Sequence, residues 1–251
     1  MIEYERLAIV LGLSIILAAA TKKAGVLNNS GVASAFVIGV SIGVLGGMEW
    51  LFLLLVFLIS GFAATKHSFA MKEIMGVQEG KKGERGWHNA WSTGLVPTAA
   101  AVLAFIEPSF FPHPVGVVVF VTAIAAGASD TFASEMGMLY KDPVMITSPS
   151  TRVSVGTNGG ITPLGTLWAL LAALHIGFWA HILFNIYPGA GGSVAPFWLL
   201  FGSLMGFVGC QIDSLLGALY ENRGKLTKHG VNLISIGGAS MISWIVLLVM
   251  T

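Results

Sequence analysis

Hydrophobic runs long enough to cross a bilayer recur along nearly the whole chain. A membrane-spanning helix needs about 20 mainly apolar residues, and several segments meet or approach that length. Their predicted ranges are 6–22, 31–48, 49–65, 88–106, 113–130, 160–183, 195–218 and 232–250. The second range is the weakest, because glycine and serine interrupt it. The pattern predicts an all-α polytopic membrane protein with about eight transmembrane helices, in a single domain over residues 1–251.

The composition supports a membrane location. Hydrophobic residues make up 55% of the chain and charged residues only 10%, with a mean hydropathy of +0.82. A soluble domain carries roughly 25% charged residues, so most of this chain must face lipid or other helices. The single cysteine, Cys210, excludes an internal disulfide and a cysteine-based metal site. The formal net charge of +1 gives no sign of a nucleic-acid partner, and a homo-oligomer is left open.

The basic residues indicate how the chain is oriented. When the loops are placed alternately on two sides, one side receives Arg6 and the other receives twelve of the 13 basic residues. These twelve are Lys22, Lys23, Lys66, Lys72, Lys81, Lys82, Arg85, Lys141, Arg152, Arg223, Lys225 and Lys228. The positive-inside rule makes their side cytoplasmic. We therefore expect a multi-pass protein of the cell membrane with both termini outside and its active face in the cytoplasm. Glu3 and Glu5 argue against a cleaved signal peptide, which needs a basic start.

Carboxylates stand at the cytoplasmic ends of two predicted helices. Asp130 follows an apolar run and precedes Glu135, while Asp213 lies near the end of the segment 195–218. A carboxylate near the membrane is a functional hypothesis by default, although each could simply pair with a neighbouring lysine or arginine. Both aspartates are followed by a hydroxyl residue, which favours a shared Mg²⁺ site. Glu135 is a further candidate ligand, or else the cap of a short interfacial helix.

A glycine-rich turn precedes the predicted helix 160–183. It consists of Gly156, Thr157, Asn158, Gly159 and Gly160. The first N–H groups of a helix lack intrahelical partners and carry partial positive charge, so they can bind an anion. Glycine allows the positive φ angles of an anion-binding nest. The turn therefore suits a phosphate, although it could equally serve as a helix cap.

Cationic and amide side chains surround these motifs. Arg85, followed by His88 and Asn89, stands where the fourth helix begins and can clamp a phosphate. The other basic residues of that loop are interpreted as solvated and attracted to anionic headgroups, namely Lys72, Lys81 and Lys82. Three polar residues begin the last helix: Lys228, His229 and Asn232. The stripe of Gly202, Gly206 and Gly209 before Asp213 predicts a close helix-packing face.

Taken in order, the motifs form a set. They are Asn29-Ser30-Gly31, the stretch Gly83 to Asn89, Asp130 to Gly137, Gly156 to Gly160, and Asp213 to Ala218. This set resembles the integral membrane family that includes plant phytyl-phosphate kinase. The resemblance implies phosphorylation of a prenyl monophosphate, often with CTP as donor. A fainter similarity extends to CDP-diacylglycerol synthase and dolichol kinase, but Arg152 stands where those enzymes carry a lysine, so no catalytic lysine is assigned.

The sequence thus predicts a kinase that uses CTP, or ATP, to convert an isoprenoid monophosphate such as phytyl or geranylgeranyl phosphate to its diphosphate. The predicted catalytic residues are Asp130, Asp213 and Arg85, and the predicted Mg²⁺ ligands are Asp130, Asp213 and Glu135. The predicted nucleotide- and phosphate-binding residues are Asn29, Ser30, Asn89, Thr131, Ser134, Gly156 to Gly160, Ser214, Lys228, His229 and Asn232. The prenyl tail is expected between the segments 31–48 and 195–218. Two alternatives stay open: a cytidylyltransferase that makes a CDP-lipid, and a transporter of an anionic substrate.

Overall fold

The computed structural model describes residues 4–78, 83–186 and 192–250, so Lys81 and Lys82 lie outside the described residues. The helices are α1 (Tyr4–Lys23), α2 (Asn29–Ser41), α3 (Met48–Lys66), α4 (Phe69–Ile74), α5 (Trp87–Ile106), α6 (His113–Gly137), α7 (Pro163–His181), α8 (Pro196–Leu216) and α9 (Lys228–Met250). Short π-helical segments extend three of them: η1 (Ile42–Gly46) follows α2, η2 (Ile182–Ile186) follows α7 and η3 (Gly217–Glu221) follows α8. With these extensions, eight helices in the described ranges are long and apolar enough to cross a membrane, as predicted.

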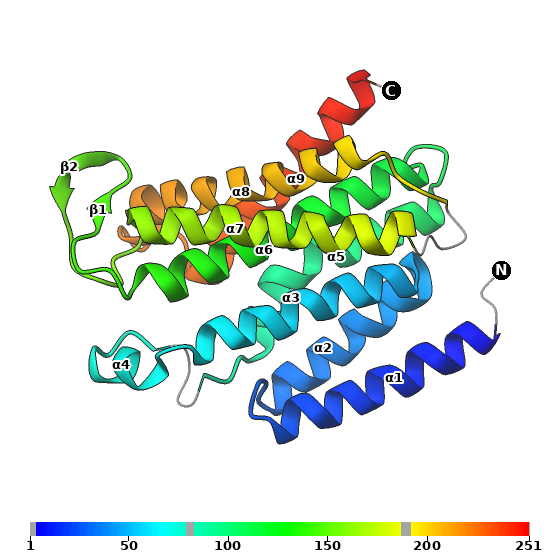
Figure 1. Cartoon of the computed structure of the whole chain (residues 1–251), viewed down its shortest axis with the longest axis horizontal. Coiled ribbons are helices and arrows are strands. Elements are labelled where there is room, and N and C mark those ends of the chain that lie inside the picture. The colour runs from blue at the N-terminus through cyan, green and yellow to red at the C-terminus, as the bar shows by residue number, and fades with distance from the viewer. Residues whose placement is uncertain (1–3, 79–82, 187–191, 251) are drawn as a thin grey trace.

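The long helices lie side by side and run back and forth between two ends of the molecule (Figure 1). Helix α1 begins and α9 finishes at the same end, whereas α4 and the strands β1 and β2 lie at the opposite end. We call the latter the polar end. The ten described basic residues that were predicted to share one side all lie in helix termini or connections at the polar end. The predicted alternation of the loops is therefore present in the structure, while the side of the membrane stays a prediction.

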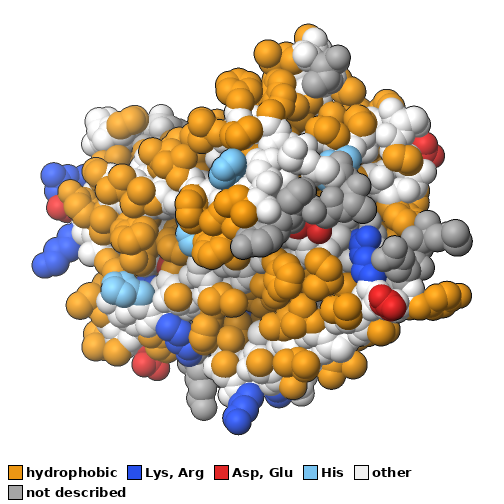
Figure 2. Space-filling model, turned by 45° about the vertical axis from the view of Figure 1, so that its right-hand side comes forward, with side chains coloured by type: hydrophobic (Ala, Val, Ile, Leu, Met, Phe, Trp, Pro, Cys, Tyr) orange, Lys and Arg blue, Asp and Glu red, His pale blue; other side chains and the backbone are white. Residues whose placement is uncertain are grey.

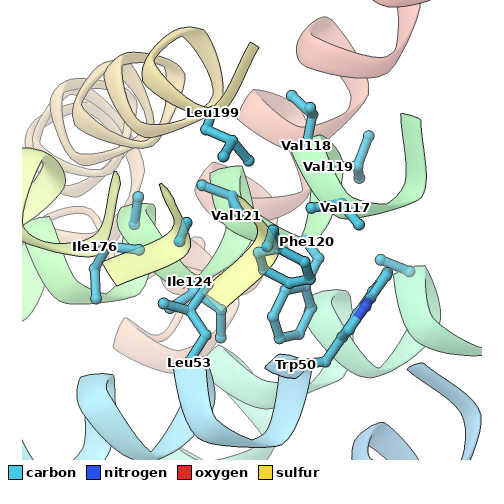
Figure 3. Packing of buried hydrophobic residues seen from close by; sticks show 14 of the residues in the cluster. Trp50, Leu53, Val117, Val118, Val119, Phe120, Val121, Ile124, Ile176 and Leu199 are labelled. Carbon is cyan, nitrogen blue, oxygen red and sulfur yellow. The ribbon is translucent and has the colours of Figure 1, made fainter. Parts of the chain in front are cut away.

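Helix α6 is the centre of the bundle. Within its most apolar stretch 89% of the residues are buried, against 11% for α1, and α6 contacts α3, α5, α7, α8 and α9. Figure 3 shows its valines and Phe120 surrounded by side chains from the neighbouring helices. The ring centroids of Phe120 and Trp50 are 4.5 Å apart. A helix that is apolar on every side is expected at such a central position.

Helix α8 packs on α6 through its glycines. A Cβ atom added to Gly206 would lie 2.4 Å from the Cβ of Ala125, and one added to Gly202 would lie 2.9 Å from the carbonyl oxygen of Val118. Only glycine lets the two backbones approach so closely. The predicted packing face is confirmed, and it fixes the part of α8 that carries Asp213.

The outer surface of the bundle is apolar. Figure 2 shows a face dominated by hydrophobic side chains, with a few charged groups scattered over it. Large hydrophobic side chains such as Ile16 of α1 and Phe178 of α7 are 65% and 59% exposed. Contiguous apolar surface of this kind is typical of a membrane interaction.

A small antiparallel sheet interrupts the helices at the polar end. Its strands are β1 (Val144–Met145), β2 (Ser148–Arg152) and β3 (Gly160–Ile161), in the order β2-β1-β3. The sequence predicted a helix from residue 160, and this start is wrong by three residues, because Gly160 pairs with Met145 in the sheet. Helix α7 starts at Pro163 after Thr162, whose Oγ1 accepts a hydrogen bond from the Gly165 N–H at 2.9 Å. A threonine N-cap followed by proline is a strong helix start.

Candidate functional site

A polar cavity of about 430 Å³ opens among the helix termini at the polar end. It is lined by the start of α5, the final turns of α6 and α8 with η3, the starts of α7 and α9, and the turn before β3. Most of the predicted site residues line it: Arg85, Asn89, Asp130, Thr131, Ser134, Glu135, Gly156, Thr157, Asn158, Gly159, Gly160, Asp213, Ser214, Lys228 and Asn232. Residues separated by more than a hundred positions along the chain are thus brought to one space.

Asp213 is held in place by helix α9. The hydroxyl of Ser235 donates a hydrogen bond to Asp213 Oδ2 at 2.8 Å. The amide nitrogen of Asn232, turned toward the same carboxylate, lies 3.3 Å from Oδ2 and 3.0 Å from the carbonyl oxygen of Lys228. Asn232 therefore orients the aspartate as well as lining the cavity. Hydrogen bonds to a carboxylate are stronger than neutral ones, so the direction of the Asp213 side chain is well defined.

Asp130 and Asp213 face the same cavity closely enough for their charges to repel, and Glu221 adds a third negative charge. Lys228 attracts both Asp213 and Glu221. No group of three or more His, Cys, Asp or Glu side chains in the described ranges is arranged to hold a metal ion by itself. Mg²⁺ is usually held by one or two carboxylates together with waters and substrate phosphates. The two aspartates therefore fit an ion that arrives with a polyphosphate better than a resident metal.

Arg85 projects between α3 and α6. Its Nη2 donates to the hydroxyl of Thr65 at 3.3 Å, and its Nη1 lies 3.5 Å from the hydroxyl of Thr131. The backbone of Arg85 is fixed too, because its N–H donates to the carbonyl of Val26 at 3.0 Å and its carbonyl accepts from the N–H of Asn28 at 3.1 Å. Both side-chain partners of Arg85 are neutral hydroxyl groups at long distances. The guanidinium is therefore suited to bind an anion through two hydrogen bonds.

Glu135 has a different partner from the predicted magnesium ion. Its Oε2 accepts a hydrogen bond from Lys72 Nζ at 2.7 Å, and the side chains are 4% and 0% exposed. Lys72 Nζ also donates to the carbonyls of Ala64 and Thr65, at 3.0 and 3.4 Å. The interpretation of Lys72 as a solvated lysine is therefore wrong. The pair ties α4 to the ends of α3 and α6, and it argues against Glu135 as a direct metal ligand.

The glycine-rich turn packs on the end of α8 rather than beginning α7. Gly156 and Gly159 have φ angles of +84° and +75°. A Cβ atom on Gly159 would lie 2.5 Å from the Cβ of Ala218, so the turn can approach η3 only with glycine at this position. The N–H of Thr157 donates to the carbonyl of Ser154, just before the turn, and the N–H of Gly160 donates to the carbonyl of Thr157. The helix start that the sequence assigned to this turn instead lies at Thr162 and Pro163; Thr162 and Gly165 are both buried in the protein and line the cavity.

Three predicted binding residues lie outside the cavity lining in the described part of the chain: Asn29, Ser30 and His229. Asn29 accepts a hydrogen bond from Lys22, and the Ser30 hydroxyl donates to Asn28 at 2.8 Å and accepts from the Trp87 N–H at 3.3 Å. These residues join the start of α2 to the start of α5. The ring of His229 stacks on His88 with centroids 5.1 Å apart.

The structure adds cavity residues that the sequence interpretation missed. Gln211 and Glu221 come from α8 and η3, and Thr162 and Thr166 come from the start of α7. Signals for some of them exist in the sequence. Thr162 before Pro163 is a helix-start signature, and Glu221 follows Asp213 by eight residues, a spacing that keeps two side chains near one helix face.

Comparison with known proteins agrees with this architecture. An uncharacterized membrane protein of Methanocaldococcus jannaschii is 33% identical over 225 residues, covering 89% of this chain and 87% of its own length. A second uncharacterized membrane protein, from Synechocystis, is 27% identical over 232 residues, covering 91% of this chain and 85% of its own length. The chloroplastic protein VTE6 of Arabidopsis thaliana is 27% identical over 224 residues, covering 86% of this chain and 64% of its own length.

No solved structure matches the chain. The family model described as integral membrane protein DUF92 matches residues 12–243, which includes every long helix in part or in full. The chain therefore belongs to the DUF92 family of integral membrane proteins and is a multi-pass membrane protein.

Proposed function

We propose that this protein is a nucleotide-dependent kinase that converts an isoprenoid monophosphate to its diphosphate. The observation that carries the proposal is the convergence of Asp130, Asp213, Arg85 and Lys228 with the Gly156–Gly160 turn on one cavity at the polar end. Two acidic side chains beside two cationic ones suit a polyphosphate with its metal ion. The similarity to VTE6 and the resemblance to the phytyl-phosphate kinase family support an isoprenoid acceptor.

The reaction would form a phosphoanhydride bond on an oxygen of the prenyl phosphate while the β–γ bridging bond of the nucleoside triphosphate breaks. The products are a prenyl diphosphate and a nucleoside diphosphate. The acceptor oxygen is already anionic, so no strong base is needed. Phosphoryl transfer depends mainly on positioning and charge neutralisation, which matches a cavity whose side chains are fixed by several helices.

Five polar side chains have an assigned task in this proposal. Asp130 and Asp213 would hold Mg²⁺, which supplies charge neutralisation on the triphosphate. Ser235 and Asn232 keep the Asp213 carboxylate directed into the cavity. Lys228 would bind donor phosphates. We propose CTP as the preferred donor, with ATP as the alternative, and we propose that the polar end faces the cytoplasm of the cell because the basic residues gather there.

The test uses purified protein in detergent with Mg²⁺, geranylgeranyl or phytyl phosphate, and CTP labelled separately on the γ-phosphate and on the base. Transfer of the γ-label into a prenyl diphosphate is the expected result, and it should be repeated with ATP. Base label in the lipid would instead identify a cytidylyltransferase. No transfer with any prenyl chain or nucleotide, together with vesicle uptake of an anionic substrate, would refute the kinase in favour of a transporter.

A further inference from the structure

A second, apolar cavity lies beside the polar one, between α1, α2, α3 and α5. We call it the apolar groove. On α3 its lining residues run from Leu51 to Phe62, which at 1.5 Å per residue is roughly 16 Å, or about half the 30 Å hydrocarbon thickness of a bilayer. The groove therefore extends from the polar end deep into the region that lipid tails occupy.

The two cavities share one wall. Arg85, Asn89 and Thr93 line both of them, and they are the residues common to the two linings. The remaining polar side chains of the apolar groove are Ser14 and Thr21, both on α1. The groove is thus apolar along its length and becomes cationic where it meets the polar cavity. An amphiphile with a long hydrocarbon chain and one anionic head matches this distribution.

We propose that the apolar groove binds the hydrocarbon tail of the isoprenoid monophosphate and that Arg85 and Asn89 hold its phosphate at the junction. This inference rests on the proposed kinase function and gives the acceptor a position that the sequence did not predict. The expected groove between α2 and α8 is wrong, because α2 packs mainly on α1 and α5, whereas α8 packs mainly on α6, α7 and α9. The donor then lies on the polar side of Arg85 and the acceptor tail on the apolar side.

Matched alanines allow the groove to be filled without touching the polar site. Ala18 of α1 and Ala35 of α2 line the groove, whereas Ala19 and Ala33, on the same helices, are exposed and lie outside its lining. Ala18→Trp and Ala35→Trp should raise the KM for geranylgeranyl phosphate at least about tenfold, since each methylene excluded from apolar burial weakens binding roughly fourfold. The KM for the nucleotide and for dimethylallyl phosphate should stay within about twofold. Ala19→Trp and Ala33→Trp should resemble the parent protein.

A second measurement tests the groove without any catalysis. A geranylgeranyl monophosphate that carries a photoreactive diazirine on its tail should label peptides of α1, α2, α3 or α5 in the absence of nucleotide and Mg²⁺. Ala35→Trp should suppress this labelling, whereas Ala33→Trp should not. Labelling confined to other helices would overturn the groove even if kinase activity is present. Full suppression by excess phosphatidylglycerol would also overturn it, since a bilayer lipid would then be the occupant. Groove labelling without phosphoryl transfer would instead refute only the proposed kinase.

Discussion

The buried ion pair between Lys72 and Glu135 gives the sharpest test of the architecture around the cavity. Lys72→Met keeps a long apolar side chain but leaves the Glu135 carboxylate buried without its 2.7 Å partner. It also removes the donor to the carbonyls of Ala64 and Thr65. Removing one member of a buried ion pair lowers the free energy of unfolding by about 3–5 kcal/mol.

That loss can be measured as a change in thermal stability. For a chain of this size, 1 kcal/mol corresponds to roughly 2–4 °C in Tm, so Lys72→Met should lower Tm by about 6–20 °C. The assay follows the folded fraction in detergent by size exclusion after heating at one fixed rate, because unfolding of such proteins is often irreversible. Lys23→Met removes the same charge from an exposed position at the end of α1 and should change the stability by less than about 0.5 kcal/mol.

A double variant separates charge from packing. Lys72→Met with Glu135→Leu removes the orphaned carboxylate, so it should recover about 2 kcal/mol of the loss, because apolar replacement of a buried pair is often neutral. The carbonyls of Ala64 and Thr65 still lack their donor in this variant. A single variant as stable as Lys23→Met, or a double variant less stable than the single one, would refute the reasoning.

Three further predictions concern the cavity. Asp130→Asn and Asp213→Asn should each abolish phosphoryl transfer in the labelled-CTP assay while the protein elutes as folded; near-normal rates in both would remove the metal proposal. Ser235→Ala deletes the 2.8 Å hydrogen bond to Asp213, and a bond to a charged group is worth about 1.5–3 kcal/mol, so kcat should fall at least about tenfold. An unchanged kcat would show that the carboxylate needs no such support. Gly159→Ala should lower Tm more than Gly224→Ala, since both have positive φ angles but only Gly159 is crowded by its neighbours; equal losses would contradict the close packing of the turn.

The long helices and much of the cavity follow from the sequence because both depend on local patterns. A run of about 20 apolar residues spans a bilayer wherever its neighbours lie. In a bundle of antiparallel spans, polar residues at alternate ends must gather at one face, so Asp130, Asp213 and Arg85 could be assigned to one end without knowing which helices touch. The glycine stripe before Asp213 likewise predicts close packing, although its partner α6 could not be named.

Features that depend on contacts between distant segments were not predictable in the same way. The burial of Lys72 requires Glu135, which lies 63 positions along the chain, and nothing in the local pattern of either segment indicates the pairing. Asn29 and Ser30 are polar residues at a helix start beside the other site motifs. Their hydrogen bonds to Lys22 and Trp87 place them at a junction between helices instead. The short sheet depends on pairing Val144 with both Arg152 and Ile161, at spacings that no periodicity reveals.

The bundle is tightly packed around the aspartates and loosely packed at α1, and this difference suits the separate phosphoryl-transfer and lipid-binding sites that we propose. The aspartates sit on α6 and α8, which interlock so tightly that glycine is required at Gly206. Precise placement of charge around a transferring phosphoryl group needs this rigidity. Helix α1 has few buried residues, and in the described part of the chain it packs mainly on α2 and η1. An acceptor that is dissolved in the bilayer must enter its site laterally. The loosely packed α1 flanks the apolar groove, so the acceptor can enter past α1 without displacing the helices that carry the aspartates. Bulky substitutions should therefore be tolerated on the outward face of α1, reduce lipid affinity on its groove face, and prevent folding along the α6–α8 contact.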